Sequence, residues 1–574
     1  MKNLSRTIAA GVLAGMAVAC AGPNEKPARG NAAASEATTA IDLAQAPAMA
    51  PPPPPAEMVA ETSSRLAAPP APVVVTGSRV AGFAPPVLDD APRHYYDQGR
   101  DRFASAEQNA FKAVGQEPVS TFSIDVDTAS YSFMRASLAR GVLPTPQSVR
   151  AEEMINYFTY DYPAPASREQ PFSTTVDVFP SPWTTGRKMV RVGIKGYELP
   201  ASALPRANLV FLIDTSGSMN APGKLPLVQR SLLMLLERLG PEDHIAIVTY
   251  AGSAGVALAP TPVRDKARIA AVIENLGAGG STAGAEGIRQ AYALAARNLD
   301  PEGVNRVILA TDGDFNVGIT STDELKGFVE RERGKGIFLS VLGFGMGNYN
   351  DALMQALAQN GNGNAAYIDS VSEARKVLVE EATSTLFPIA KDVKIQIEFN
   401  PATVAEYRLI GYETRMLKRE DFENDRVDAG EVGSGQSVTA LYEIVPVGGP
   451  SALGGLRYAP QRAAERAAAG EYGFVKIRYK RPEASASKLI STPIDRSREA
   501  ARFEAAPRDA RFAVGVATFA ELLRGGRYAG SMTYDDVLAM VTPAVGRDEF
   551  GYRTEFVQLV RGTKSASSMA RLGE

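Results

Sequence analysis

The chain has 574 residues, of which 45% are hydrophobic, and its formal net charge at pH 7 is -3. This length allows two or three domains, and the near-neutral charge gives no indication of a nucleic-acid partner. With one cysteine, Cys20, and two histidines, His94 and His244, the chain cannot build a Cys/His zinc site or a disulfide framework.

The first twenty residues have the pattern of a secretory signal peptide. Basic residues precede an apolar segment over residues 8–19, which is too short to span a membrane. Ala17 and Ala19 suit ordinary signal cleavage. The segment Ala17-Val-Ala-Cys20 also resembles a bacterial lipobox, although Ala17 stands where lipoboxes usually carry leucine.

The lipobox resemblance implies a lipid anchor. It makes residues 1–20 a lipoprotein signal peptide and Cys20 the acylated residue. Multiple acyl chains on Cys20 would give stable anchoring. Ala21 follows the cysteine where an aspartate would retain the protein in the inner membrane, so the resemblance implies a bacterial envelope protein anchored in the outer membrane.

Residues 21–97 are rich in alanine, proline, serine and threonine, and they include the run Pro51 to Pro55. Such a composition buries too little apolar surface to offset chain entropy. We expect a disordered tether that holds the globular part away from the membrane.

Residues 98–200 are expected to form a helical segment followed by a β-hairpin. The hairpin is indicated by alternating apolar residues at 172–179 and 188–194. Asp125 and Asp127 could form a metal or acid/base pair, but a strand followed by a helix is the preferred interpretation. Asp127 or Thr128 would then be the helix N-cap.

The central domain, residues 205–388, alternates short apolar runs with amphipathic segments. This alternation predicts an α/β fold with a doubly wound, mostly parallel sheet and helices on both faces. We expect strands at 209–213, 244–250, 336–342 and 365–368, and a strand over 304–313 that ends in an acidic turn. Helices are expected at 224–239, 264–276, 351–359 and 371–386, and the glycine-rich segment 277–288 opens a further helix that runs to about residue 299.

Oxygen-bearing side chains gather at the expected carboxyl edge of this sheet. Asp214, Ser216 and Ser218 follow the first strand, Thr282 lies in a glycine-rich loop before a helix, and Asp312 ends another strand. Ligands bind at this edge of open α/β sheets, and hard oxygen ligands suit a divalent cation such as Mg²⁺. The first three residues alone would equally suit a serine-rich turn that caps the next helix.

These motifs resemble the metal-ion-dependent adhesion site of von Willebrand factor type A domains. D-T-S-G-S, G-G-S-T-A-G and A-T-D-G occur in the order of that family. The resemblance implies a von Willebrand factor A (Rossmann-like) fold in which Asp214, Ser216, Ser218, Thr282 and Asp312 are the metal ligands. It also implies a divalent ion, Mg²⁺ before Ca²⁺ or Mn²⁺, with one position free for a partner's carboxylate.

The resemblance extends beyond the central domain. From about Gln98 onward the chain is similar to a bacterial envelope family that joins an N-terminal segment, this domain and a C-terminal domain of unknown function.

In residues 389–574, alternating patterns at 393–399, 407–412, 437–445 and 472–479 predict an antiparallel sandwich, followed by helices that begin near Arg508. An isolated two-stranded hairpin is only marginally stable. We therefore hypothesise that the hairpin at 172–194 belongs to this sandwich, so that the central domain is inserted between its strands.

Three functions are compatible with the sequence. The first is an envelope binding protein that captures an acidic residue of an unidentified protein partner through the metal. The second is a structural scaffold whose site is completed internally by Asp314 or a C-terminal acid. The third, a metal-assisted hydrolase, is disfavoured because no general base lies near the site by spacing. His94 lies in a proline-rich segment, and His244 opens an apolar strand.

Overall fold

A computed structural model describes residues 101–103, 106–279, 284–313, 322–347, 349–454 and 470–572. The predicted signal peptide with Cys20, the tether over residues 21–97, Thr282 and Asp314 lie outside the described residues. No helix within the described ranges is long and apolar enough to span a bilayer.

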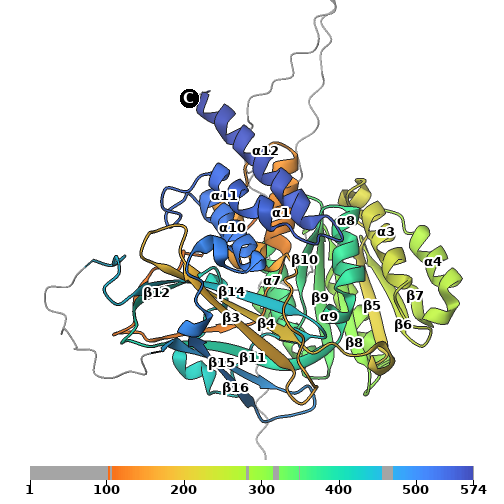
Figure 1. Cartoon of the computed structure of the whole chain (residues 1–574). Coiled ribbons are helices and arrows are strands. Elements are labelled where there is room, and N and C mark those ends of the chain that lie inside the picture. The colour runs from red at the N-terminus through yellow and green to blue at the C-terminus, as the bar shows by residue number, and fades with distance from the viewer. Residues whose placement is uncertain are drawn as a thin grey trace, which may run out of the picture. The chain divides into compact units, whose positions relative to one another are not determined.

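The central domain contains a sheet whose strand order is β10-β9-β8-β5-β6-β7 (Figure 1). Every neighbouring pair is parallel except β6 and β7, as expected for a mostly parallel sheet. The prediction missed β7, a partly exposed edge strand that contains two prolines. The strands are β5 (Ala207–Asp214), β6 (His244–Tyr250), β7 (Ala254–Pro262), β8 (Val304–Thr311), β9 (Ile337–Phe344) and β10 (Ala365–Ile368).

Helices cover both faces of this sheet, and the fold class is therefore confirmed. Alternate residues of β5 enter different cores, because successive strand side chains point to opposite faces. Leu209 and Phe211 pack with helices α3 (Leu225–Leu236), α4 (Lys266–Glu274) and α8 (Val371–Arg375). Val210 and Leu212 pack with α5 (Gly284–Arg297), α6 (Thr322–Arg333) and α7 (Asp351–Asn360).

The helix expected over 371–386 is interrupted. After α8 the chain forms a π-helical segment, Lys376–Glu380, and then α9 (Ala382–Leu386). Strand β11 (Pro388–Phe399) begins two residues after α9, so the last helical segment of the central domain leads directly into the sandwich.

Two antiparallel sheets form the sandwich, and their inner faces share one hydrophobic core. The first has the order β1-β12-β14-β4-β3; the second has the order β13-β11-β15-β16, with β2 also paired to β11. The remaining strands are β1 (Lys112–Ala113), β2 (Val119–Ser123), β3 (Phe172–Pro180), β4 (Lys188–Gly196), β12 (Val404–Ile410), β13 (Val432–Gly433), β14 (Ser437–Pro446), β15 (Glu471–Lys480) and β16 (Lys488–Asp495).

The hairpin hypothesis is confirmed by strand pairing. β4 pairs with β3 on one side and with β14 on the other, with Val192 opposite Ala440. Strand β2 likewise pairs with β11, across more than 270 residues of sequence. The sandwich is therefore built from segments on both sides of the central domain, as predicted.

A helical layer packs beside the sandwich (Figure 1). It combines α1 (Ala129–Ala139) and α2 (Ala151–Asn156) with α10 (Arg508–Leu523), α11 (Tyr534–Val541) and α12 (Tyr552–Leu572). The single tryptophan, Trp183, is buried in this core and donates a hydrogen bond from Nε1 to Thr518 Oγ1 at 2.8 Å. The sequence pattern did not identify α12.

The two aspartates before α1 have a structural role that differs from the expected cap. Thr128 occupies the N-cap position, but neither it nor Asp127 makes a side-chain cap to the helix. Instead Asp127 accepts a hydrogen bond from Ala365 N at 2.8 Å and forms an ion pair with Arg415 at 2.7 Å. Asp125 also pairs with Arg415, at 3.0 Å. Both carboxylates therefore attach the N-terminal segment to distant parts of the fold.

Candidate metal centre

Strand β5 positions the first candidate ligand. All of its residues are buried, and it is paired in parallel with β6 on one side and β8 on the other. Asp214 is its last residue, fully buried, in register with Tyr250 at the end of β6. A central, doubly paired strand therefore presents this carboxylate at the carboxyl edge, where open α/β sheets bind ligands.

The loop after β5 brings further oxygens to Asp214. The backbone N–H of Ser216 donates to Asp214 Oδ1 at 2.8 Å, which fixes the carboxylate. The hydroxyls of Ser216 and Ser218 lie 3.0 Å apart. Asp214 Oδ2 is buried without a hydrogen bond of regular geometry from the described residues, although the Tyr250 hydroxyl lies close enough to oppose the rise in the pKa of Asp214 that burial causes. Since an unsatisfied buried carboxylate oxygen is costly, this atom is suited to binding a cation.

The third-loop candidate, Asp312, lies at the same edge. It follows β8, the neighbour of β5, and its side chain is 1% exposed. Burial raises the pKa of Asp214, and the negative charge of Asp312 raises it further. Two buried carboxylates at adjacent strand ends create a site that a positive charge would stabilise.

A positive charge that the sequence analysis did not identify is already present. Lys224 Nζ donates to Asp312 Oδ2 at 2.7 Å. Lys224 is the N-cap residue of α3, and helix N-termini favour anions over cations. Because a lysine is unfavourable at a helix N-terminus, its presence there could have indicated that Lys224 interacts with a group outside the helix.

The glycine-rich second loop approaches the site at its described end. Gly279 N donates to Thr215 O at 2.7 Å, which joins the start of this loop to the first metal loop. Helix α5 then begins at Gly284, and Gly287 packs closely against Tyr250 and Leu212. Thr282 lies between these two anchors, outside the described residues.

The donor set fits a hard divalent cation. Two carboxylates and two hydroxyls, all oxygen ligands, are placed by two adjacent strands, and Mg²⁺ and Ca²⁺ prefer such ligands. The described ranges contain no cluster of three or more His, Cys, Asp or Glu side chains that could hold a metal ion. A centre at this edge therefore depends on its serine hydroxyls as well as on its carboxylates.

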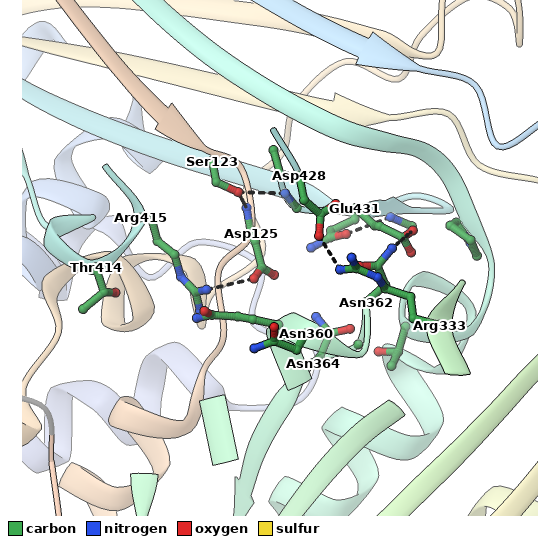
Figure 2. Close-up of a pocket in the computed structure, with 18 of the residues that line it drawn as sticks. Ser123, Asp125, Arg333, Asn360, Asn362, Asn364, Thr414, Arg415, Asp428 and Glu431 are labelled. Carbon is green, nitrogen blue, oxygen red and sulfur yellow. Dashed lines mark hydrogen bonds and ion pairs between the residues drawn. The ribbon is translucent and has the colours of Figure 1, made fainter. Parts of the chain in front are cut away.

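A polar cavity of about 350 Å³ lies between the central domain and the sandwich (Figure 2). Two polar contacts at the cavity join the central domain to the sandwich: Arg333 pairs with Asp428, and Asn362 Nδ2 donates to Glu431 Oε1 at 3.0 Å. Figure 2 also shows Arg415 beside Asp125, which follows β2 of the sandwich. Because the first two contacts join the two halves of the fold, we assign the cavity a structural role.

Comparison with known proteins identifies the family. The family model described as von Willebrand factor type A domain matches residues 208–381, which contain all five candidate ligands. A model described as von Willebrand factor matches residues 97–191, and one described as uncharacterized protein YfbK, C-terminal, matches residues 384–566. The chain is 43% identical over 474 residues to the uncharacterized protein YfbK of Escherichia coli (strain K12), covering 81% of this chain and 82% of that protein. The chain belongs to the YfbK family.

More distant relatives match a smaller share of the chain or at lower identity. Human inter-alpha-trypsin inhibitor heavy chain H4 is 28% identical over 202 residues, covering 34% of this chain and 21% of that protein. A solved structure, the von Willebrand factor type A protein from Catenulispora acidiphila, is 14% identical with a TM-score of 0.37, covering 70% of this chain and 98% of that one. The family model over residues 208–381 shows that this member of the YfbK family carries a type A domain, a domain family in which metal-dependent protein binding is general.

Proposed function

We propose that this YfbK-family protein is an envelope-anchored binding protein that uses the metal centre to hold an acidic residue of a protein partner. The observation that carries the proposal is the convergence of Asp214, Ser216, Ser218 and Asp312 at one sheet edge of a type A domain. A bound Mg²⁺ would supply a Lewis-acidic position that accepts a carboxylate oxygen.

The four candidate ligands have two different roles. Asp214 and Asp312 supply negative charge to hold the ion, and the hydroxyls of Ser216 and Ser218 add neutral oxygens. The two carboxylates balance the formal charge of a divalent ion, and the hydroxyls add no charge, so a partner's Asp or Glu would bind at the coordination position that these four residues leave open. Ser218 is exposed, which supports a centre whose open side faces the surface.

Binding is favoured over hydrolysis by the position of the histidine in β6. His244 is the first residue of β6, while Tyr250 at its other end is level with Asp214. Six residues of extended strand separate these ends by about 20 Å. His244 is therefore too far from the metal centre to activate water there.

A crosslinking pull-down from cell envelopes tests the binding proposal. Partners should be captured by the wild-type chain in Mg²⁺, lost in EDTA, recovered on adding Mg²⁺ back, and not captured by Asp214→Ala. Asn220→Ala, on the exposed side of the same loop, is the matched control and should capture the same partners. Capture by Asp214→Ala at the wild-type level would refute the proposal.

The anchor is tested separately, because it depends on Cys20 alone. Cys20→Ser should remove the protein from the outer-membrane fraction and release it as a soluble envelope species. Unchanged fractionation of Cys20→Ser would refute lipid anchoring while leaving the metal centre untouched.

A further inference from the structure

We propose that Lys224 is a built-in counter-cation of the metal centre, which balances the buried carboxylates of the metal-free site and weakens the binding of the divalent ion. This inference rests on the proposed function for the presence of a metal, and it adds a determinant of how tightly that metal is held.

The geometry places the ammonium group at a candidate ligand. Lys224 lies six residues after Ser218, at the end of the turn that follows the first metal loop. Its side chain crosses to the third loop, where Nζ lies 2.7 Å from Asp312 Oδ2. Lys224 is 13% exposed and Asp312 is 1% exposed, so water screens this pair only weakly.

A third segment guides the lysine stem. Gly345, in the loop after β9, has φ +75° and lies directly against the methylene groups of Lys224. A Cβ atom added at Gly345 would lie 2.5 Å from Cε and 2.8 Å from Cγ of Lys224. The loop therefore leaves room for this side chain only because it carries no side chain of its own there.

The charge balance explains why a lysine is placed here. Asp214 and Asp312 are both buried, and buried carboxylates without a counter-charge strongly destabilise a fold. The ammonium of Lys224 supplies one positive charge and so supports the metal-free domain. A divalent ion bound by the same carboxylates meets this charge at close range, and the repulsion is worth at least about a factor of ten in affinity at an effective dielectric constant near 20.

The inference predicts a metal affinity that rises when the charge is removed. Isothermal titration of Mg²⁺ into the purified chain should give a Kd for Lys224→Met that is about ten-fold or more below that of the wild type. Lys224→Arg keeps the charge and should stay within about three-fold of the wild type. Lys266→Met, which removes an exposed lysine paired with Glu237 in the same domain, is the matched control and should leave the Kd unchanged.

Thermal unfolding supplies a second readout. In EDTA, Lys224→Met should melt below the wild type, and saturating Mg²⁺ should abolish or reverse this difference. Lys224→Gln retains a hydrogen-bond donor without the charge, and it gives the same test if the methionine variant does not fold without metal.

The outcomes separate the inference from the proposed function. Equal or weaker Mg²⁺ binding by folded Lys224→Met and Lys224→Gln, with wild-type binding that Asp214→Ala abolishes, overturns the role of Lys224 alone. Absence of Mg²⁺ binding in the wild type and in every Lys224 variant overturns both proposals. Tighter binding by Lys224→Met and Lys224→Gln, with wild-type affinity in Lys224→Arg, supports the counter-cation.

Discussion

Replacing Arg150 by methionine should destabilise the whole assembly around the metal domain. Arg150 precedes α2, and its guanidinium donates to both carboxylate oxygens of Asp351 at 2.9 Å and to Glu153. Asp351 begins α7 of the type A domain and is 1% exposed, so this contact joins the N-terminal segment to that domain through buried charges.

The magnitude follows from what the substitution leaves behind. Glu153 keeps hydrogen bonds from Ser130 N at 2.8 Å and from Gln355 Nε2 at 2.9 Å, whereas Asp351 keeps only a long contact from the Tyr349 hydroxyl at 3.4 Å among its described side-chain partners. Removing one member of a buried ion pair costs about 3–5 kcal/mol, because the other charge remains buried without compensation. Methionine preserves much of the apolar volume, so this cost comes mainly from Asp351.

Urea unfolding measures this cost, with the fluorescence of Trp183 as the probe. Arg150→Met should lower the free energy of unfolding by about 3–5 kcal/mol, and adding Asp351→Asn should recover a substantial part, because it removes the orphaned charge. Arg547→Met removes an arginine from an exposed pair and should change stability by less than about 1 kcal/mol. A loss below about 1 kcal/mol in Arg150→Met would refute the argument.

Further predictions concern the cavity and the loop that lines it. Burial raises the pKa of Glu431 from its usual 4.5 to about 7, so the folded chain binds a proton that the unfolded chain releases between those values. Stability therefore falls as pH rises through this window, by at most about 3 kcal/mol, and Glu431→Gln should flatten the pH dependence of Tm between pH 5 and 8. An unchanged slope would contradict this. In the loop before β10, a Cβ on Gly363 would lie 1.9 Å from the Leu339 carbonyl oxygen. Gly363→Ala should cost about 3 kcal/mol in urea unfolding, whereas Gly115→Ala, with open space around it, should be nearly neutral; equal effects would refute the packing argument.

Local pattern was sufficient to predict most strands of the central sheet and of the sandwich, but not the edge strands β7 and β16. The continuous apolar run that ends at Asp214 indicated a strand buried on both faces, and its place in the middle of the sheet explains that pattern. The hairpin at 172–194 was assigned to the sandwich because such a hairpin is marginal alone. Strand β7 was not predicted because it lies at an edge of the sheet, where burial does not impose an apolar pattern on the sequence.

Contacts between residues that are distant in the sequence could not be predicted from local pattern. Lys224 and Asp312 are separated by 88 positions, and Arg150 and Asp351 by 201, so their pairing depends on the finished fold. The immediate neighbours of Asp127 suggested that Asp127 or Thr128 caps the helix, and Thr128 does occupy the N-cap position. The actual partner of Asp127, Arg415, lies 288 positions away, and local spacing carries no information about such a contact.

The Mg²⁺ dependence of partner binding tests the central claim most directly. A captured partner is held at fixed concentration, and its binding is measured as a function of Mg²⁺ concentration. The Mg²⁺ concentration for half-maximal binding should agree with the Kd for Mg²⁺ from calorimetry, once the increase in Mg²⁺ affinity caused by the bound partner is taken into account. Asp214→Ala should remove both binding events together. Partner binding that persists at full strength in EDTA, or that survives in Asp214→Ala, would contradict a metal-dependent binding function.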